Sequence, residues 1–166
     1  MDAELSAALI MFDDGDPTDL ETDRQRLRDL YDADTPRIPD AVRVRDVQAA
    51  PPLGPPVRVR LYEPRVVESP LPALLWLHGG AFSHGFAELD DDLCFRMAAD
   101  AGFVVLSPDY RLSPEHPFPA GFDDAYATLT WLAGQADVLG IDSMHIGVRL
   151  QRRRRARGRD LPAGAR

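Results

Sequence analysis

The chain has no lysine, a single cysteine and no hydrophobic run long enough to cross a bilayer. All 19 basic residues among the 166 are arginine. The lone Cys94 excludes an internal disulfide, which is typical of a protein from a reducing compartment. A membrane helix needs about 18 apolar residues in succession, and none is present. The acidic N-terminus also lacks the basic stretch of a secretory signal. We therefore expect a cytoplasmic protein of one domain.

Charge is distributed unevenly along the chain. The net charge is −8, but the tail 149–166 carries +7, which leaves −15 on residues 1–148. An acidic body repels nucleic acid and anionic lipid, so no nucleic-acid partner is expected. The alternative is that the arginines at 152–155 bind nucleic acid by releasing counterions. No recognition fold and no row of aromatic side chains accompanies them, which disfavours this alternative.

Residues 1–35 are predicted to be helical. Thr18 or Asp19 can cap a helix N-terminus here, and two prolines end the region at positions 36 and 39. Four apolar side chains share one helical face: Leu20, Leu27, Leu30 and Tyr31. The pattern predicts one helix that packs through this face.

Strands and helices alternate over the following residues. The segments AVRVRDV and VRVRLYEP alternate apolar with charged residues, which predicts two half-exposed strands paired antiparallel. Three apolar runs predict buried strands at Ala73–His78, Phe103–Tyr110 and Met144–Val148. Helices are predicted between them at Glu88–Gly102 and Gly121–Gln135. This order is typical of an α/β fold with a mostly parallel sheet, entered through an antiparallel hairpin.

A glycine-rich loop, HGGAFSHG, follows the first of these buried strands. Two consecutive glycines, Gly79 and Gly80, let the backbone approach a ligand and turn its N–H groups outward. Donors of that kind stabilise the oxyanion that forms at an ester carbonyl under attack. The simpler alternative is a tight turn from strand to loop, without chemistry.

Together with the segment SPDYRLSPEHPFPAGFDDAY at Ser107–Tyr126, this loop resembles the hormone-sensitive-lipase family of α/β-hydrolases. In that family an H-G-G-[GA] loop precedes a D-Y-R-L-[AS]-P-E-H-x-[FY]-P-A segment at about this interval. The resemblance is close from Val57 to Val148, whereas the first fifty residues resemble the family's helical cap only in kind. It implies an α/β-hydrolase fold and a serine-dependent hydrolase of small carboxylic esters. No cofactor and no metal are implied.

The resemblance assigns roles to residues of both segments. Gly79, Gly80 and Ala81 would form the oxyanion-hole loop, and His78 would support that loop without acting as the general base. Five residues of the second segment would form a polar scaffold beneath the site: Asp109, Tyr110, Arg111, Glu115 and His116.

The family's nucleophile is missing. Its serine lies in a G-x-S-x-G turn after the strand that corresponds to Met144–Val148, and no such motif occurs in this chain. The family's acid and base follow the serine in chain order, so we expect both to lie beyond the end of the chain. The 166 residues are therefore expected to be inactive alone. A non-catalytic binding module that keeps the oxyanion loop is a further alternative.

The sequence thus predicts a truncated α/β-hydrolase in three parts. Residues 1–40 would form a helical cap region, 41–148 the N-terminal half of the hydrolase domain, and 149–166 an Arg-rich tail that is disordered or a frameshift product. Read one base later, GC-rich codons for the tail can encode Gly-Ser-Ser-Ala-Gly. A frameshift after Val148 is our hypothesis for the tail.

No other residue provides a clear reactive group. Ser83 lies in the glycine loop with no base predicted beside it, and Ser113 and Ser143 are predicted to be loop residues. His84, His116 and His145 are expected at the surface or in loops, and no residue pair has metal-ligand spacing. Several residues fit structural roles: acids at the starts of helices (Asp90, Asp91, Asp92, Asp123, Asp124) and the predicted core residue Cys94.

Overall fold

The computed structural model describes residues 19–50, 54–65 and 70–150. The predicted tail after Leu150 and the first 18 residues therefore lie outside the described residues. The elements are, in chain order, α2 (Leu20–Ala33), β1 (Val42–Ala49), β2 (Val57–Pro64), β3 (Leu71–Leu77), α3 (Asp91–Ala101), β4 (Val104–Pro108), α4 (Ala120–Gly134), α5 (Ala136–Leu139) and β5 (Ile141–Leu150).

The five strands form one mixed sheet in the order β1-β2-β4-β3-β5. β1 pairs antiparallel with β2, and β2 pairs antiparallel with β4. β3 pairs parallel with both β4 and β5. The predicted hairpin and parallel α/β unit are confirmed. Because β3 and β4 are paired in parallel, their carboxyl ends are neighbours. The loops that carry the two sequence motifs therefore start side by side.

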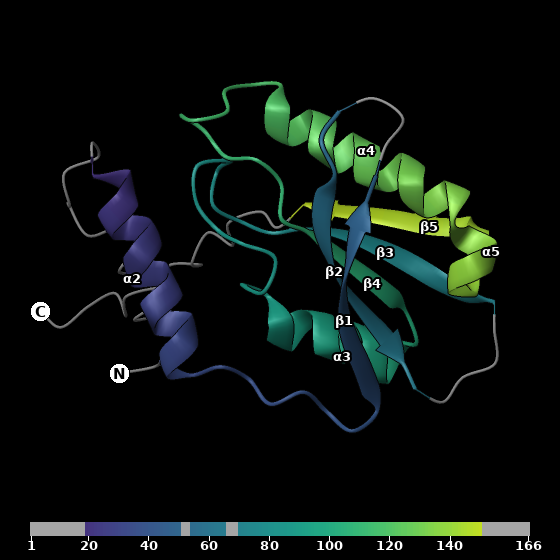
Figure 1. Ribbon diagram of the computed structural model, residues 1–166. Coiled ribbons are helices and arrows are strands. Elements are labelled where there is room, and N and C mark those ends of the chain that lie inside the picture. Colours follow the sequence, from purple (N-terminus) through teal and green to yellow (C-terminus); the bar gives the residue numbers. More distant parts are fainter. Residues whose placement is uncertain (1–18, 51–53, 66–69, 151–166) are drawn as a thin grey trace, which may run out of the picture.

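Helices cover both faces of this sheet. α3 lies on one face and α4 with α5 on the other (Figure 1). The α3 face encloses an apolar cluster that includes Trp76, Phe95 and the fully buried Cys94, which is a core residue as predicted. The α4 face encloses a second cluster around Leu75 and Leu132. The sheet thus has a hydrophobic core on each side, as a fold of alternating strands and helices requires.

β5 differs from the predicted buried strand. It begins at Ile141, so Ser143 lies inside it and not in a preceding loop. It ends at Leu150, and the first two residues of the predicted tail continue it. Met144 is 85% exposed and Val148 52% exposed. The reason is position: β5 is the last strand of the sheet, and within the described residues it pairs only with β3.

The helix α2 stands beside the sheet (Figure 1). Asp19 caps it as predicted, with its carboxylate 3.2 Å from the backbone nitrogen of Thr22. None of its residues is buried, and Leu30 is 39% exposed. A helix is present at Leu20–Ala33, within the predicted region. Its contacts with the rest of the described chain are mainly polar. No helix in the described ranges is long and apolar enough to cross a membrane.

Candidate active site

The loop that follows β3 has an unusual backbone. Gly80 has φ 121°, and the next two residues, Ala81 and Phe82, have φ 53° and 60°. Left-handed conformations are rare outside glycine, and two in succession cost free energy that surrounding contacts must offset. The amides of Ser83 and His84 both donate to the Gly80 carbonyl at 3.0 Å, which closes the turn. The amides of Gly79, Gly80 and Ala81 donate to no atom of the described residues.

His78 lies inside this loop and is 1% exposed. Its Nδ1 is 2.9 Å from the Gly79 carbonyl oxygen, so Nδ1 carries the proton. The ring stacks on Tyr110 with 4.1 Å between centroids, and the Tyr110 hydroxyl donates to the His78 carbonyl at 2.7 Å. Burial lowers the pKa of His78 below its ordinary value of 6.5, so the ring is neutral at neutral pH. A neutral ring that stacks on Tyr110 and donates to the Gly79 carbonyl suits a support for the loop.

Gly85 closes the loop over His78, a role that the sequence analysis missed. It has φ 99°, and a Cβ at this position would lie 2.4 Å from His78 Nδ1 and 2.5 Å from the Gly79 carbonyl oxygen. Only glycine fits such a close approach. The sequence shows the glycine, but it does not show that the histidine ring returns to it.

The second motif forms the loop after β4. The Arg111 guanidinium binds the buried Asp124 at 2.8 Å, and the Arg111 amide donates to the same carboxylate at 2.9 Å. The interpretation of Asp124 as a helix-opening acid is therefore incomplete, because this carboxylate also fixes the loop. Asp109 accepts from the Ala87 amide at 3.3 Å and from Arg58 at 3.5 Å. The contacts of Asp109 hold the loop where it leaves β4, and the contact of Arg111 with Asp124 holds it against α4.

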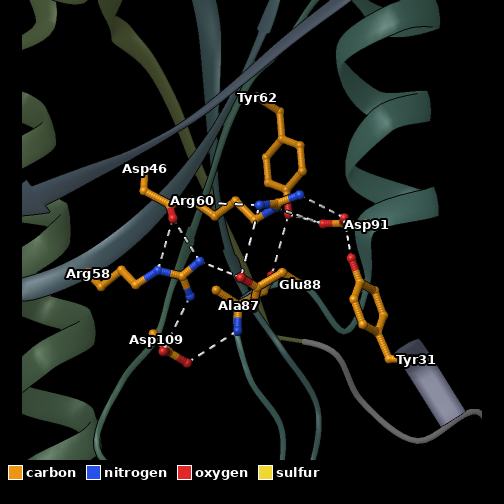
Figure 2. A network of polar contacts seen from close by, with 9 residues as sticks. All are labelled: Tyr31, Asp46, Arg58, Arg60, Tyr62, Ala87, Glu88, Asp91 and Asp109. Atoms are coloured by element: carbon orange, nitrogen blue, oxygen red, sulfur yellow. Dashed lines mark hydrogen bonds and ion pairs between the residues drawn. The ribbon is translucent and has the colours of Figure 1, made fainter. Parts of the chain in front are cut away.

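A larger polar network joins α2, β2 and the start of α3 (Figure 2). At its centre the carboxylate of Asp91 accepts from Arg60 at 3.0 and 3.1 Å, from Tyr62 at 2.6 Å and from Tyr31 at 2.8 Å. Arg58 binds Glu88 alongside. Asp91 does lie in the first turn of α3, but four donors satisfy it, so its role extends well beyond the helix dipole.

A pocket of about 340 Å³ lies between α2 and the two motif loops. Its lining is largely polar and charged: Glu21, Arg24, Gln25, Arg28, Gly85, Phe86, Asp109, Tyr110 and Leu112. The guanidinium of Arg28 lies 3.9 Å above the Phe86 ring. The pocket therefore reaches the glycine-rich loop at Gly85 and the second motif at Tyr110.

The prediction that no base stands beside Ser83 is wrong. The Ser83 hydroxyl lies 2.8 Å from Nδ1 of His84 and 3.1 Å from the Gly80 carbonyl oxygen. No carboxylate of the described residues binds His84, so nothing orients this imidazole as a triad requires. His145 is paired with Asp142 at 2.7 Å on the exposed strand β5, far along the chain from these loops.

The remaining candidates lie outside any reactive cluster. Ser113 and His116 are in the loop after β4, as predicted, where the Ser113 amide donates to the Phe82 carbonyl at 2.8 Å. Among the described residues, no group of three His, Cys, Asp or Glu side chains is placed to hold a metal ion.

Comparison with known proteins agrees with this architecture. Residues 74–149 match the model of a family described as having the alpha/beta hydrolase fold. The structure of a bacterial heroin esterase superimposes with a TM-score of 0.78 at 38% identity, over 89% of this chain and 47% of that one. An esterase from Pyrobaculum calidifontis gives a TM-score of 0.75 at 36% identity, over 88% of this chain and 47% of that one. The chain thus has the α/β-hydrolase fold.

Sequence relatives narrow the class. Esterase LipI of Mycobacterium tuberculosis is 38% identical over 143 residues, which are 84% of this chain and 42% of LipI. Over the part that these matches cover, the chain is similar to these esterases, which agrees with the predicted resemblance to the hormone-sensitive-lipase family of α/β-hydrolases. It spans less than half the length of LipI and of the two esterase structures.

Proposed function

We propose that this chain forms the oxyanion-binding part of a site that hydrolyses small carboxylic esters, and that its 166 residues alone catalyse no serine-dependent turnover. The observation that carries the proposal is the loop after β3, where three successive amides, at Gly79, Gly80 and Ala81, have no partner among the described residues.

These amides suit the charge that develops during ester hydrolysis. When a nucleophile attacks an ester carbonyl, negative charge moves to the carbonyl oxygen, and preorganised N–H donors stabilise it by about 3 kcal/mol each. Preorganisation is supported by the contacts of His78 with Tyr110 and Gly79. The loop can therefore hold an acyl oxygen without rearranging.

The nucleophile is the missing component. The family resemblance implies a serine in G-x-S-x-G, a histidine base and an acid that orients it, and the sequence has no such motif. Ser83 has an imidazole beside it but no orienting carboxylate among the described residues. We therefore assign oxyanion binding to this chain and no covalent step.

Anion binding to the loop tests the proposal without a nucleophile. Acetate, titrated into the ¹⁵N-labelled chain, is expected to shift the amide resonances of Gly79, Gly80 and Ala81 saturably. Chloride at equal ionic strength is the control for salt effects, and the Gly134 amide, at the end of α4, is the internal reference. Equal responses to the two anions, or no response at the loop, would overturn the proposal.

A further inference from the structure

The cap helix α2 donates a hydrogen bond directly into the oxyanion loop through Arg24. Its Nε donates to the carbonyl of Ser83 at 2.8 Å, inside the loop. One terminal nitrogen donates to the carbonyl of Ser113 at 2.6 Å, inside the second motif. The Arg24 side chain is only 20% exposed, so it lies between the helix and both loops.

Glu115 orients this guanidinium. Its two carboxylate oxygens accept from the two terminal nitrogens of Arg24 at 2.7 and 3.0 Å. A two-point contact fixes the plane of the guanidinium, and the Nε then points at the Ser83 carbonyl. Lysine cannot reproduce this arrangement because it presents a single point charge. Glu115 is thereby connected to the loop through the Arg24 guanidinium.

The point of attachment matters for the strained part of the loop. Ser83 directly follows Ala81 and Phe82, whose positive φ angles need outside support. The Phe82 carbonyl accepts from the Ser113 amide at 2.8 Å, and the next carbonyl accepts from Arg24. Two consecutive carbonyls are thus held from outside the loop, one by the second motif and one by α2.

We propose that Arg24, oriented by Glu115, is a positioning residue that couples the docking of α2 to the conformation of the oxyanion amides at Gly80 and Ala81. The inference rests on the proposed function, because it gives the loop its role. The cap helix α2 then sets the geometry of the amide donors at Gly80 and Ala81 in addition to lining the pocket.

The chain offers matched variants for a test. Arg24→Gln removes the contact, and Arg24→Lys keeps the charge without the planar group. Arg26→Gln is the control on the same helix, since Arg26 is 51% exposed and pairs with Asp23 inside α2. Tyr31→Phe removes the other polar anchor of α2, the hydroxyl that donates to Asp91.

Two readouts are taken for each variant: the amide shifts of Gly80 and Ala81 without ligand, and the dissociation constant of acetate at the loop. Arg24→Gln is expected to move both resonances and to weaken acetate binding about three- to tenfold, the effect of one net hydrogen bond. Arg24→Lys should be intermediate, and Arg26→Gln should match the unmodified chain.

Two results would refute the inference. If Arg24→Gln and Arg26→Gln give the same loop shifts, the inference is wrong. If Tyr31→Phe moves the loop as much as Arg24→Gln, the loop responds to helix docking in general, and the specific role of Arg24 is wrong.

If Arg24→Gln does not fold, Glu115→Gln takes its place in the comparison with Arg26→Gln, because it loosens the guanidinium from outside α2. Failure of acetate to bind the unmodified chain would instead refute the proposed function, while the ligand-free shifts would still test the role of Arg24.

Discussion

At the scale of single residues, the candidate site depends on a close contact between Gly85 and the buried, neutral ring of His78. Gly85 packs directly on the His78 ring, and the ring packs on Tyr110. The loop shape is therefore set by the contact between a glycine and an imidazole seven residues apart.

The first prediction concerns Gly85→Ala. The new Cβ would lie 2.5 Å from the Gly79 carbonyl oxygen, at a backbone φ of 99° that alanine disfavours. We expect a loss of about 2–4 kcal/mol in the free energy of unfolding, measured by urea denaturation. Gly134→Ala is the control, because a Cβ there meets nothing within 4 Å, and no loss is expected. Equal changes in the two variants would contradict this account of the loop.

The second prediction is a pH dependence caused by His78. Burial lowers the pKa of His78 in the folded chain below its ordinary value of 6.5. At a pH between the folded-state pKa and 6.5, the unfolded chain therefore binds more protons than the folded chain. The free energy of unfolding should therefore fall as the pH drops below 6.5, by at most about 1.4 kcal/mol per pH unit. Glu115, whose pKa the Arg24 hydrogen bond lowers to about 2, contributes only below the ordinary glutamate value of 4.5.

The variant His78→Gln separates these contributions. It cannot titrate, so its unfolding free energy should change less between about pH 7 and pH 5 than that of the unmodified chain. Urea denaturation at both pH values measures the difference. An unchanged slope would show that His78 is not the titrating group.

At the scale of elements, hydrophobic periodicity predicted every described strand and the three longer helices, with ends displaced by up to three residues. It failed for the exposure of β5. The apolar run Met144–Val148 is typical of a strand covered on both faces, but a sequence does not show which strand lies at the edge. Ser143 was misplaced for a related reason: the polar residues at 142, 143 and 145 break the apolar pattern at the start of β5.

The third prediction follows from this edge. An edge strand with apolar side chains and free backbone groups favours pairing with other chains. We expect concentration-dependent self-association, measured by sedimentation velocity, and a marked decrease in Met144→Lys. The control is Val138→Lys, because Val138 is 81% exposed on α5 and not on a strand. If both variants reduce association equally, the effect comes from added charge and not from the edge.

At the scale of the whole molecule, two motifs predicted a candidate site, and the parallel pairing of β3 and β4 places the starts of their loops side by side. The partners that hold the loops could not be predicted. Arg24 and Ser83 are 59 residues apart, and Tyr31 and Asp91 are 60 apart. Such pairs leave no periodic pattern in the sequence, because they depend on how α2 docks. The Ser83–His84 contact was missed although the residues are adjacent, since it depends on the turn geometry.

The fourth prediction concerns the tail. Residues 151–166 lie outside the described part of the chain, so the frameshift hypothesis and the alternative of nucleic-acid binding both stay predictions. The gene, read one base later past the codon for Val148, is expected to encode G-x-S-x-G and then an Asp or Glu and a His. Nucleotide sequencing checks this. A next frame without these residues would refute the frameshift.

The central claim is that the purified 166-residue chain presents oxyanion donors but no activated nucleophile. Reaction with a fluorophosphonate probe, followed by peptide mass spectrometry, tests it most directly, because the probe modifies serines that a base activates. We expect the chain to carry no probe. A stoichiometric adduct at one hydroxyl, for which Ser83 beside His84 is the first place to look, would contradict it.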